Sequence, residues 1–163
     1  MIHTEPNWKS YMVETTEPVF TPEQCNIISK LGRSMPPQNA QVGGGSGGEY
    51  NTKTRISHIS WIPFDQPDSI QMYKKLEDVM HKTNRRHFGF QDMAINEQAQ
   101  YTEYPEGGFY DWHMDIDLVM KKEPPVRKIS MTLVLSHESE FEGGGLELAR
   151  PGNILKPKQG HAI

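Results

Sequence analysis

A chain of 163 residues is long enough for one domain with its own core and short for two. Its net charge of −4, without a long run of one sign, lacks the basic footprint typical of nucleic-acid binding, and its single cysteine excludes an internal disulfide framework. No apolar stretch approaches membrane-spanning length and residues 1–10 are too polar for a signal peptide, so we expect a cytoplasmic protein with no membrane or nucleic-acid partner.

The first predicted element is a helix that begins at Thr21, where threonine caps and Pro22 suits the first helical position. Its apolar stripe ends at Gly32 and consists of Cys25, Ile27, Ile28 and Leu31. We expect Cys25 to be a buried or idle thiol. A loop over 34–51 contains the run GGGSGG at 43–48, which lacks the lysine and Ser/Thr of a phosphate-binding loop and therefore favours a lid or a linker.

A half-buried strand and a second helix are expected next. Apolar and polar residues alternate over 55–62, which predicts the strand. The following segment, 68–88, predicts the helix, with Asp68 or Ser69 near its cap. Its stripe is expected to be core: Ile70, Tyr73, Leu76, Val79 and Met80.

The remainder of the chain is expected to be strands. They cover 94–104, 109–115, a central strand at 127–136, a short segment at 146–148 and one more at 153–163. Turns at 105–108 and 141–145 and an exposed loop at 117–126 join them. Helices first and at least five strands afterwards favour a mostly β fold, an antiparallel sandwich or jelly roll with supporting helices, over a doubly wound parallel sheet.

The candidate chemistry lies in the predicted strand at 109–115. Residues two apart on a strand share a face, so His113 and Asp115 are expected to aim at one point. An imidazole and a carboxylate that converge supply two of the three ligands of a facial triad, which leaves positions on iron(II) open. By itself, the pattern His-x-Asp is also typical of an ordinary surface pair.

With its neighbours, this pattern resembles the prolyl 4-hydroxylase-like branch of the iron(II)- and 2-oxoglutarate-dependent oxygenases, in particular the small microbial and viral members. The features that carry the resemblance are Tyr104, Gly107-Gly108, Tyr110, His113-Met114-Asp115, Arg127 with Ser130 and Thr132, and Gly144-Gly145-Leu146. The predicted helix at 21–31 and strand at 55–61 are similar to the family's amino-terminal support, so the resemblance extends over nearly the whole chain.

The resemblance implies a double-stranded β-helix as a single domain over 1–163, with helical support over about 1–93 and a barrel core over about 94–163. It implies a dioxygenase that uses Fe(II), the cosubstrate 2-oxoglutarate and ascorbate as reductant to hydroxylate a peptide or protein residue, with proline a candidate. His113 and Asp115 would be catalytic metal ligands, Tyr104 would reach the cosubstrate and Tyr110 the substrate. Barrel packing stays an alternative for both tyrosines and is the favoured reading for Arg127, Ser130 and Thr132.

The family's third ligand, a late histidine followed by an Arg or Lys for the distal carboxylate, has no clear counterpart. His161 falls where the family's pattern is variable, and His137 follows the central strand in a loop-like context. Surface or capping roles are expected for the others: His3, His58, His81 and His87. We favour the interpretation that the last strands, with the third ligand, lie beyond Ile163.

Two further classes stay open from the sequence. A non-catalytic binding module on the same β-helix fold is favoured by the missing third histidine and opposed by the intact His113-x-Asp115. A cupin-like sugar or metal binder would cluster several histidines around a glycine turn, and that pattern is absent. The substrate and the oligomeric state are not encoded in any pattern of the chain.

Overall fold

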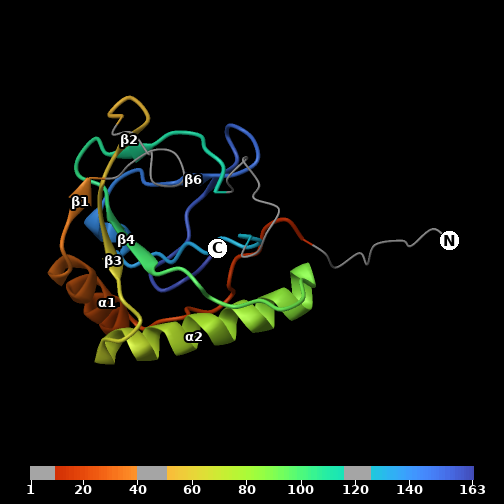
Figure 1. Cartoon of the computed structure of the whole chain (residues 1–163). Coiled ribbons are helices and arrows are strands. Elements are labelled where there is room, and N and C mark those ends of the chain that lie inside the picture. Colours follow the sequence, from red (N-terminus) through yellow and green to blue (C-terminus); the bar gives the residue numbers. More distant parts are fainter. Residues whose placement is uncertain (1–9, 40–50, 116–125) are drawn as a thin grey trace. The chain divides into compact units, whose positions relative to one another are not determined.

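The computed structural model describes residues 10–39, 51–115 and 126–163. The predicted loops at 43–48 and 117–126 lie outside or almost outside these ranges. Figure 1 shows the elements in chain order. They are α1 (Pro22–Ser34), β1 (Gln38–Asn39), β2 (Arg55–Ile56), β3 (His58–Ile62), α2 (Pro67–Thr83), the π-helix η1 (Asn84–Phe88), β4 (Ala99–Glu103), β5 (Phe109–Tyr110), the 3₁₀ helix η2 (Glu138–Glu140), β6 (Leu146–Glu147) and β7 (Ile154–Leu155).

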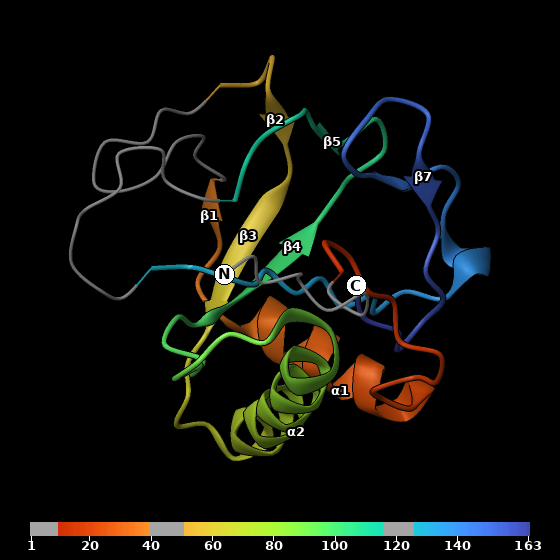
Figure 2. The ribbon, with the colours of Figure 1, turned by 90° about the vertical axis from the view of Figure 1, so that its right-hand side faces the viewer.

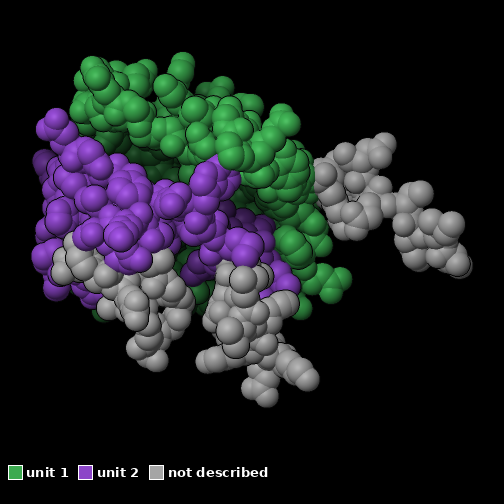
Figure 3. All heavy atoms as spheres, turned by 90° about the horizontal axis from the view of Figure 1, so that it is seen from above, with its two compact units in different colours: residues 1–29, 64–97, 131–163 green, residues 30–63, 98–130 purple. Residues whose placement is uncertain are grey.

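The chain forms two compact units, coloured separately in Figure 3. Unit 1 combines Met1–Ser29, Phe64–Glu97 and Met131–Ile163, and unit 2 combines Lys30–Pro63 and Gln98–Ser130. Each therefore depends on contacts between segments distant in sequence. Among the described residues, no helix has the length and apolar character needed to cross a membrane.

Helix α1 begins where the sequence predicted. The Thr21 Oγ1 accepts a hydrogen bond from the backbone N–H of Gln24 (3.3 Å), and the Gln24 Oε1 accepts one from the N–H of Thr21 (3.1 Å). This reciprocal cap satisfies two of the N–H groups that a helix start leaves unpaired. The expected end at Gly32 is wrong, because the helix continues to Ser34. Gly32 instead allows close packing in unit 2: a Cβ there would lie 2.2 Å from the Cγ of Tyr101.

Helix α2 starts slightly earlier than predicted. Its N-cap is Gln66, with Pro67 in the first turn. Ser69 lies near the cap as expected, and its Oγ accepts a hydrogen bond from the Gln66 N–H at 3.1 Å. The regular helix ends at Thr83, and the remainder of the expected helix is the single π-helical turn η1.

The buried face of α2 is only partly the predicted one. Tyr73 and Met80 are buried as expected, whereas Ile70 is 38% exposed and Met72 is buried in its place. Unit 1 draws its buried apolar residues from its three segments: Val19, Phe20, Cys25, Ile28, Met72, Tyr73, Met80 and Ala162. Cys25 is fully buried, as predicted, and this burial raises the pKa of its thiol.

Unit 2 contains two small antiparallel sheets, visible in Figure 2. The first has the order β1-β3-β4, with Ser60 opposite Tyr101, and the second pairs β2 with β5. The predicted strand at 55–62 is thus divided at Ser57, and its two parts have different partners. The predicted strand at 94–104 is shortened to β4, and the expected turn at 105–108 is confirmed by the Gly108 N–H, which donates to the carbonyl of Pro105 (2.7 Å).

The central strand expected at 127–136 is wrong. Residues 126–136 form only an isolated bridge, in which Leu133 lies opposite Ala162. The Thr132 N–H donates to the carbonyl of Ile163 (2.8 Å), and the Ile163 N–H donates to that of Thr132 (2.9 Å). Apolar, β-branched composition favours extended chain, but a strand also needs a long partner, which the described residues do not provide. The short strand expected at 146–148 forms as β6 and pairs with β7. The strand expected at 153–163 is reduced to β7, followed by the isolated bridge at Ala162.

The double-stranded β-helix and the single domain over 1–163 stay predictions. The described strands form one three-stranded and two two-stranded sheets, and their order does not amount to a jelly roll.

Candidate metal centre

The candidate site lies in unit 2, where a tight turn feeds the chain into β5. Gly107 adopts a φ of +71°, a left-handed conformation that glycine reaches without strain, and β5 follows at once. Antiparallel pairing places Tyr110 directly opposite Arg55, and the Asp111 N–H extends the ladder by donating to the Thr54 carbonyl (2.8 Å). The turn and this pairing fix the position from which the chain reaches His113.

The imidazole of His113 is held on two sides. Its Nδ1 lies 2.8 Å from the carbonyl oxygen of Asp111, so Nδ1 carries the hydrogen and donates it. Its ring stacks on that of Tyr110, with centroids 3.6 Å apart and planes 13° from parallel. Fixing the tautomer and the plane leaves the Nε2 lone pair directed away from the backbone. A carbonyl on the other ring nitrogen is typical of metal-binding histidines.

Asp115 supplies the second donor atom. Its Oδ1 lies 3.2 Å from the Nε2 of His113, and its backbone carbonyl accepts a hydrogen bond from the Arg127 Nη1 (2.7 Å). Two donor atoms that each lie about 2.1 Å from one metal ion, at a right angle, are separated by about 3.0 Å. The donor set, one imidazole nitrogen and one carboxylate oxygen without thiolate, suits iron(II). The two residues therefore fit adjacent positions of a metal ion.

The sequence predicted this convergence for a reason that is wrong in detail. His113 and Asp115 do not share the face of a strand, because β5 ends at Tyr110. They approach through an irregular segment in which the Asp111 carbonyl holds one imidazole nitrogen and Arg127 holds the backbone of Asp115. Both side chains are accessible, with 35% of His113 and 52% of Asp115 exposed.

A third ligand is not found within the part of the chain that the structure describes, where no group of three His, Cys, Asp or Glu residues is arranged to hold a metal ion. The Nδ1 of His161 donates a hydrogen bond to the carbonyl oxygen of Thr15 (2.8 Å). His137 caps η2, since its Nδ1 accepts from the Ser139 N–H (3.2 Å). His81 lies 4.0 Å from Glu77 on the surface of α2, and His58 is exposed. His3 lies outside the described residues.

Tyr104 stands at the end of β4, about half exposed at 52%. Burial of part of its surface raises the pKa of its phenol; the positive charge of Arg55 opposes this shift and Tyr110 reinforces it. Its hydroxyl is consequently protonated at neutral pH and can donate a hydrogen bond.

Arg55 is a residue of the site that the sequence did not single out. It is 5% exposed, and its guanidinium carbon lies 4.3 Å from the centroid of the Tyr110 ring. Its Nε donates to the Ser57 Oγ (2.7 Å) and its Nη2 to the Gln100 Oε1 (2.9 Å). The available signal was its place in the alternating pattern, on the face that also carries Ile59.

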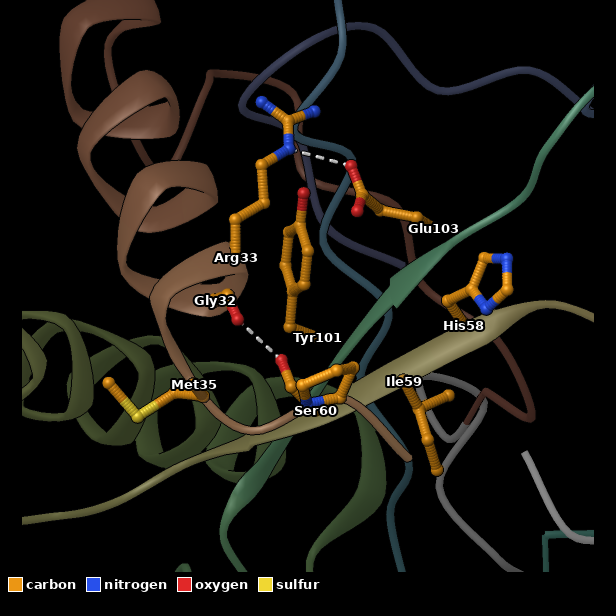
Figure 4. A pocket seen from close by; sticks show the side chains of 9 residues that line it. Gly32, Arg33, Met35, His58, Ile59, Ser60, Tyr101 and Glu103 are labelled. Carbon is orange, nitrogen blue, oxygen red and sulfur yellow. Dashed lines mark hydrogen bonds and ion pairs between the residues drawn. The ribbon is translucent and has the colours of Figure 1, made fainter. Parts of the chain in front are cut away.

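Described residues of unit 2 line two hollows that bear on the search for a ligand site. An open pocket of about 370 Å³ borders the site and is lined by Met114, Asp115, Arg127, Lys128 and Ser130. The other, of about 80 Å³, lies between the end of α1 and the three-stranded sheet (Figure 4). There Arg33 pairs with Glu103 (2.7 Å), and the Ser60 Oγ donates to the Gly32 carbonyl (2.6 Å). It is too small for an organic ligand, so of these two pockets the first is the one relevant to the site.

Comparison with known proteins agrees with the chemistry of this site. Residues 99–163 match the family model of the 2OG-Fe(II) oxygenase superfamily. The match supports that superfamily, and with it an oxidoreductase of the dioxygenase type that depends on iron(II) and 2-oxoglutarate. No curated protein and no solved structure matches the chain. The matched segment contains Tyr104, Tyr110, His113 and Asp115.

Proposed function

We propose that this chain is a hydroxylase of the prolyl 4-hydroxylase-like type, which acts on a peptide or protein residue, with proline a candidate, and uses ascorbate as reductant. The observation that carries the proposal is the distance of 3.2 Å between the Nε2 of His113 and the Oδ1 of Asp115, inside a segment that matches the oxygenase superfamily. The same proposal includes a double-stranded β-helix fold. It also includes a third metal ligand outside the described residues.

In this proposal His113 and Asp115 hold the metal, and the remaining residues prepare them for it. When bound, iron(II) supplies the coupling of 2-oxoglutarate decarboxylation to hydroxylation by dioxygen. The Asp111 carbonyl engages Nδ1 of His113 and so leaves Nε2 as the nitrogen that would bind the metal, and Arg127 fixes the backbone that presents Asp115. These contacts set both donor atoms before the metal arrives, so less ordering is required on binding.

The cosubstrate would occupy the pocket of about 370 Å³ beside Asp115. This volume is within the range of small-molecule sites, and Arg127 and Lys128 contribute positive charge that attracts a dianion. Tyr104 would donate a hydrogen bond from its protonated phenol to 2-oxoglutarate, and Tyr110 would contact the substrate. The exposed apolar side chains beside the ligands, Trp112 (50%) and Met114 (59%), suit contact with a peptide.

The test is turnover. Purified chain is incubated with iron(II), 2-oxoglutarate, ascorbate and a proline-containing peptide library, and succinate is followed together with a mass increase of one oxygen on the peptide. Succinate that depends on iron(II) and increases with a peptide supports the hydroxylase. The second candidate, a non-catalytic binding module, is favoured by the lack of a third ligand among the described residues. It predicts peptide binding without succinate under any of these conditions.

A further inference from the structure

We propose that Arg55 is a positioning residue for the metal centre: its guanidinium fixes the ring of Tyr110, and this ring holds the imidazole of His113 in the orientation that directs Nε2 to Asp115. The metal-binding part of this inference rests on the proposed function. The part that concerns the metal-free protein does not.

The burial of Arg55 is the first observation. Arginine is rarely fully buried unless it is paired, yet Arg55 is 5% exposed. Among residues 10–39, 51–115 and 126–163, no carboxylate lies within 4.0 Å of its guanidinium, and its hydrogen-bond partners, Ser57 and Gln100, are neutral. A buried cation that lacks a counter-ion needs other compensation, and the face of Tyr110 provides it.

The contact between Arg55 and Tyr110 follows from the register. The two residues are directly opposite each other in the β2–β5 pair, where cross-strand side chains meet. The guanidinium lies 4.3 Å from the ring centroid, a geometry in which the charge is attracted by the negative face of the ring, and more strongly so when water is excluded. Gln100, on β4, and Ser57, between β2 and β3, fix the guanidinium in turn.

The last step leads from Tyr110 to the metal ligand. With centroids 3.6 Å apart, the tyrosine ring forbids rotation of the imidazole out of its plane on that side. The Asp111 carbonyl fixes one nitrogen but leaves the ring able to turn about this bond, so the stack is the contact that defines the plane. Arg55, which touches neither donor atom, therefore controls the direction of Nε2 through Tyr110.

The role assigned to Tyr110 here concerns its ring and not its hydroxyl. Tyr110→Phe should accordingly keep the orientation of His113, whereas Tyr110→Leu should lose it. At position 55, Arg55→Met keeps the length of the side chain and removes charge and donors. Arg55→Lys keeps the positive charge but lacks the planar guanidinium, so it should preserve the orientation of His113 in part.

The first measurement uses the metal-free full chain. Stacking places the His113 ring protons above Tyr110, where the ring current shifts their NMR signals upfield; loss of one signal set in His113→Gln assigns them. In Arg55→Met and Tyr110→Leu these signals should move toward those of the exposed histidines, while Tyr110→Phe retains the shift and Arg55→Lys is intermediate. Arg33→Met, which removes a more exposed arginine paired with Glu103, is the matched control and should leave them unchanged.

The second measurement is the affinity for Co(II), a redox-stable substitute for iron(II), by calorimetry. Contacts that orient ligands typically contribute 10–100-fold, so Arg55→Met should weaken binding about tenfold, and Arg33→Met should not. Unchanged His113 signals in a folded Arg55→Met protein would overturn the inference, as would displaced signals with unchanged Co(II) affinity. If the wild-type chain binds no Co(II), the proposed function fails, and the NMR comparison decides the positioning of His113 by itself.

Discussion

Two histidines of the matched segment make the same backbone contact but have different surroundings. They are His113 in unit 2 and His161 in unit 1. Each has its Nδ1 2.8 Å from a backbone carbonyl oxygen, that of Asp111 for His113 and that of Thr15 for His161. Only His113 also stacks on an aromatic ring and faces a carboxylate. A carbonyl on one nitrogen prepares an imidazole to bind a metal, but a site also requires a second donor at a suitable distance.

The contact of His161 serves a structural purpose. The carbonyl of Thr15 accepts a hydrogen bond from the His161 ring. In addition, the Thr15 Oγ1 accepts from the Ala162 N–H (3.0 Å), and the Thr15 N–H donates to the Ala162 carbonyl (2.9 Å). These bonds connect the segment before α1 to residues 160–163. In the described part of unit 1, His161 belongs to this connection, and its assignment as a ligand is not favoured.

The largest expected effect is at the metal pair. His113→Ala and Asp115→Ala should each abolish turnover and reduce Co(II) affinity at least a hundredfold, because each removes a donor atom. Stability should change little, since a carboxylate and an imidazole that are both exposed contribute little to the fold. Succinate production, calorimetry and thermal unfolding measure the three quantities.

Asp117→Ala changes the next aspartate along the chain, outside the described residues, and serves as the control. The Asp117→Ala protein should retain wild-type turnover and wild-type affinity for Co(II). A His113→Ala protein with wild-type succinate production would remove His113 from the centre altogether.

The opposite behaviour is expected of His161. His161→Ala should leave Co(II) affinity within twofold of the wild type and lower the free energy of unfolding by roughly 1 kcal/mol, the net contribution of one hydrogen bond. Urea denaturation at constant pH gives the stability. A large loss of Co(II) affinity in a folded protein would instead identify His161 as the third ligand.

A smaller effect is expected for the cosubstrate. Tyr104→Phe removes the phenolic donor and keeps the ring, so the apparent KM for 2-oxoglutarate should rise about tenfold, at the lower end of the roughly 1.5–3 kcal/mol for a hydrogen bond to a charged group. Steady-state kinetics in which 2-oxoglutarate and the peptide are each varied measures the two KM values separately. A change confined to the KM of the peptide would point to packing at the entrance.

The smallest effect concerns the ionisation of Tyr104. Its pKa is raised by burial and lowered by the charge of Arg55, so Arg55→Met should raise the pKa further. Ultraviolet titration of tyrosinate detects the shift, and Tyr104→Phe identifies which component of the curve belongs to this residue. An unchanged pKa in Arg55→Met would place Arg55 too far from Tyr104 to act on it.

Local chemistry made several parts of the fold predictable. The cap at Thr21, the turn at 105–108 and the glycine turn before β6 each depend on residues within a few positions of one another. The same holds for His113 and Asp115, which are two residues apart and were predicted to converge. Their neighbours in sequence, Tyr110 and Asp111, complete the arrangement.

Local sequence patterns did not predict the features that depend on contacts between distant segments. Gly32 indicated a helix end, but its missing side chain makes room for Tyr101. Residues 127–136 have the composition of a central strand, and only a bridge to Ala162 forms among the described residues.

The sequence by itself determined that an imidazole and a carboxylate, the donors of the proposed centre, would lie close together, because residues two apart are local neighbours. Only the tertiary structure decided what holds these donors. Arg55 is 55 residues from Tyr110 in the chain, and antiparallel pairing of β2 with β5 places one opposite the other. Strand register is set by pairing across the whole sheet and is not written in either strand alone. For that reason the convergence of His113 and Asp115 could be predicted from the sequence, and the arginine behind them could not.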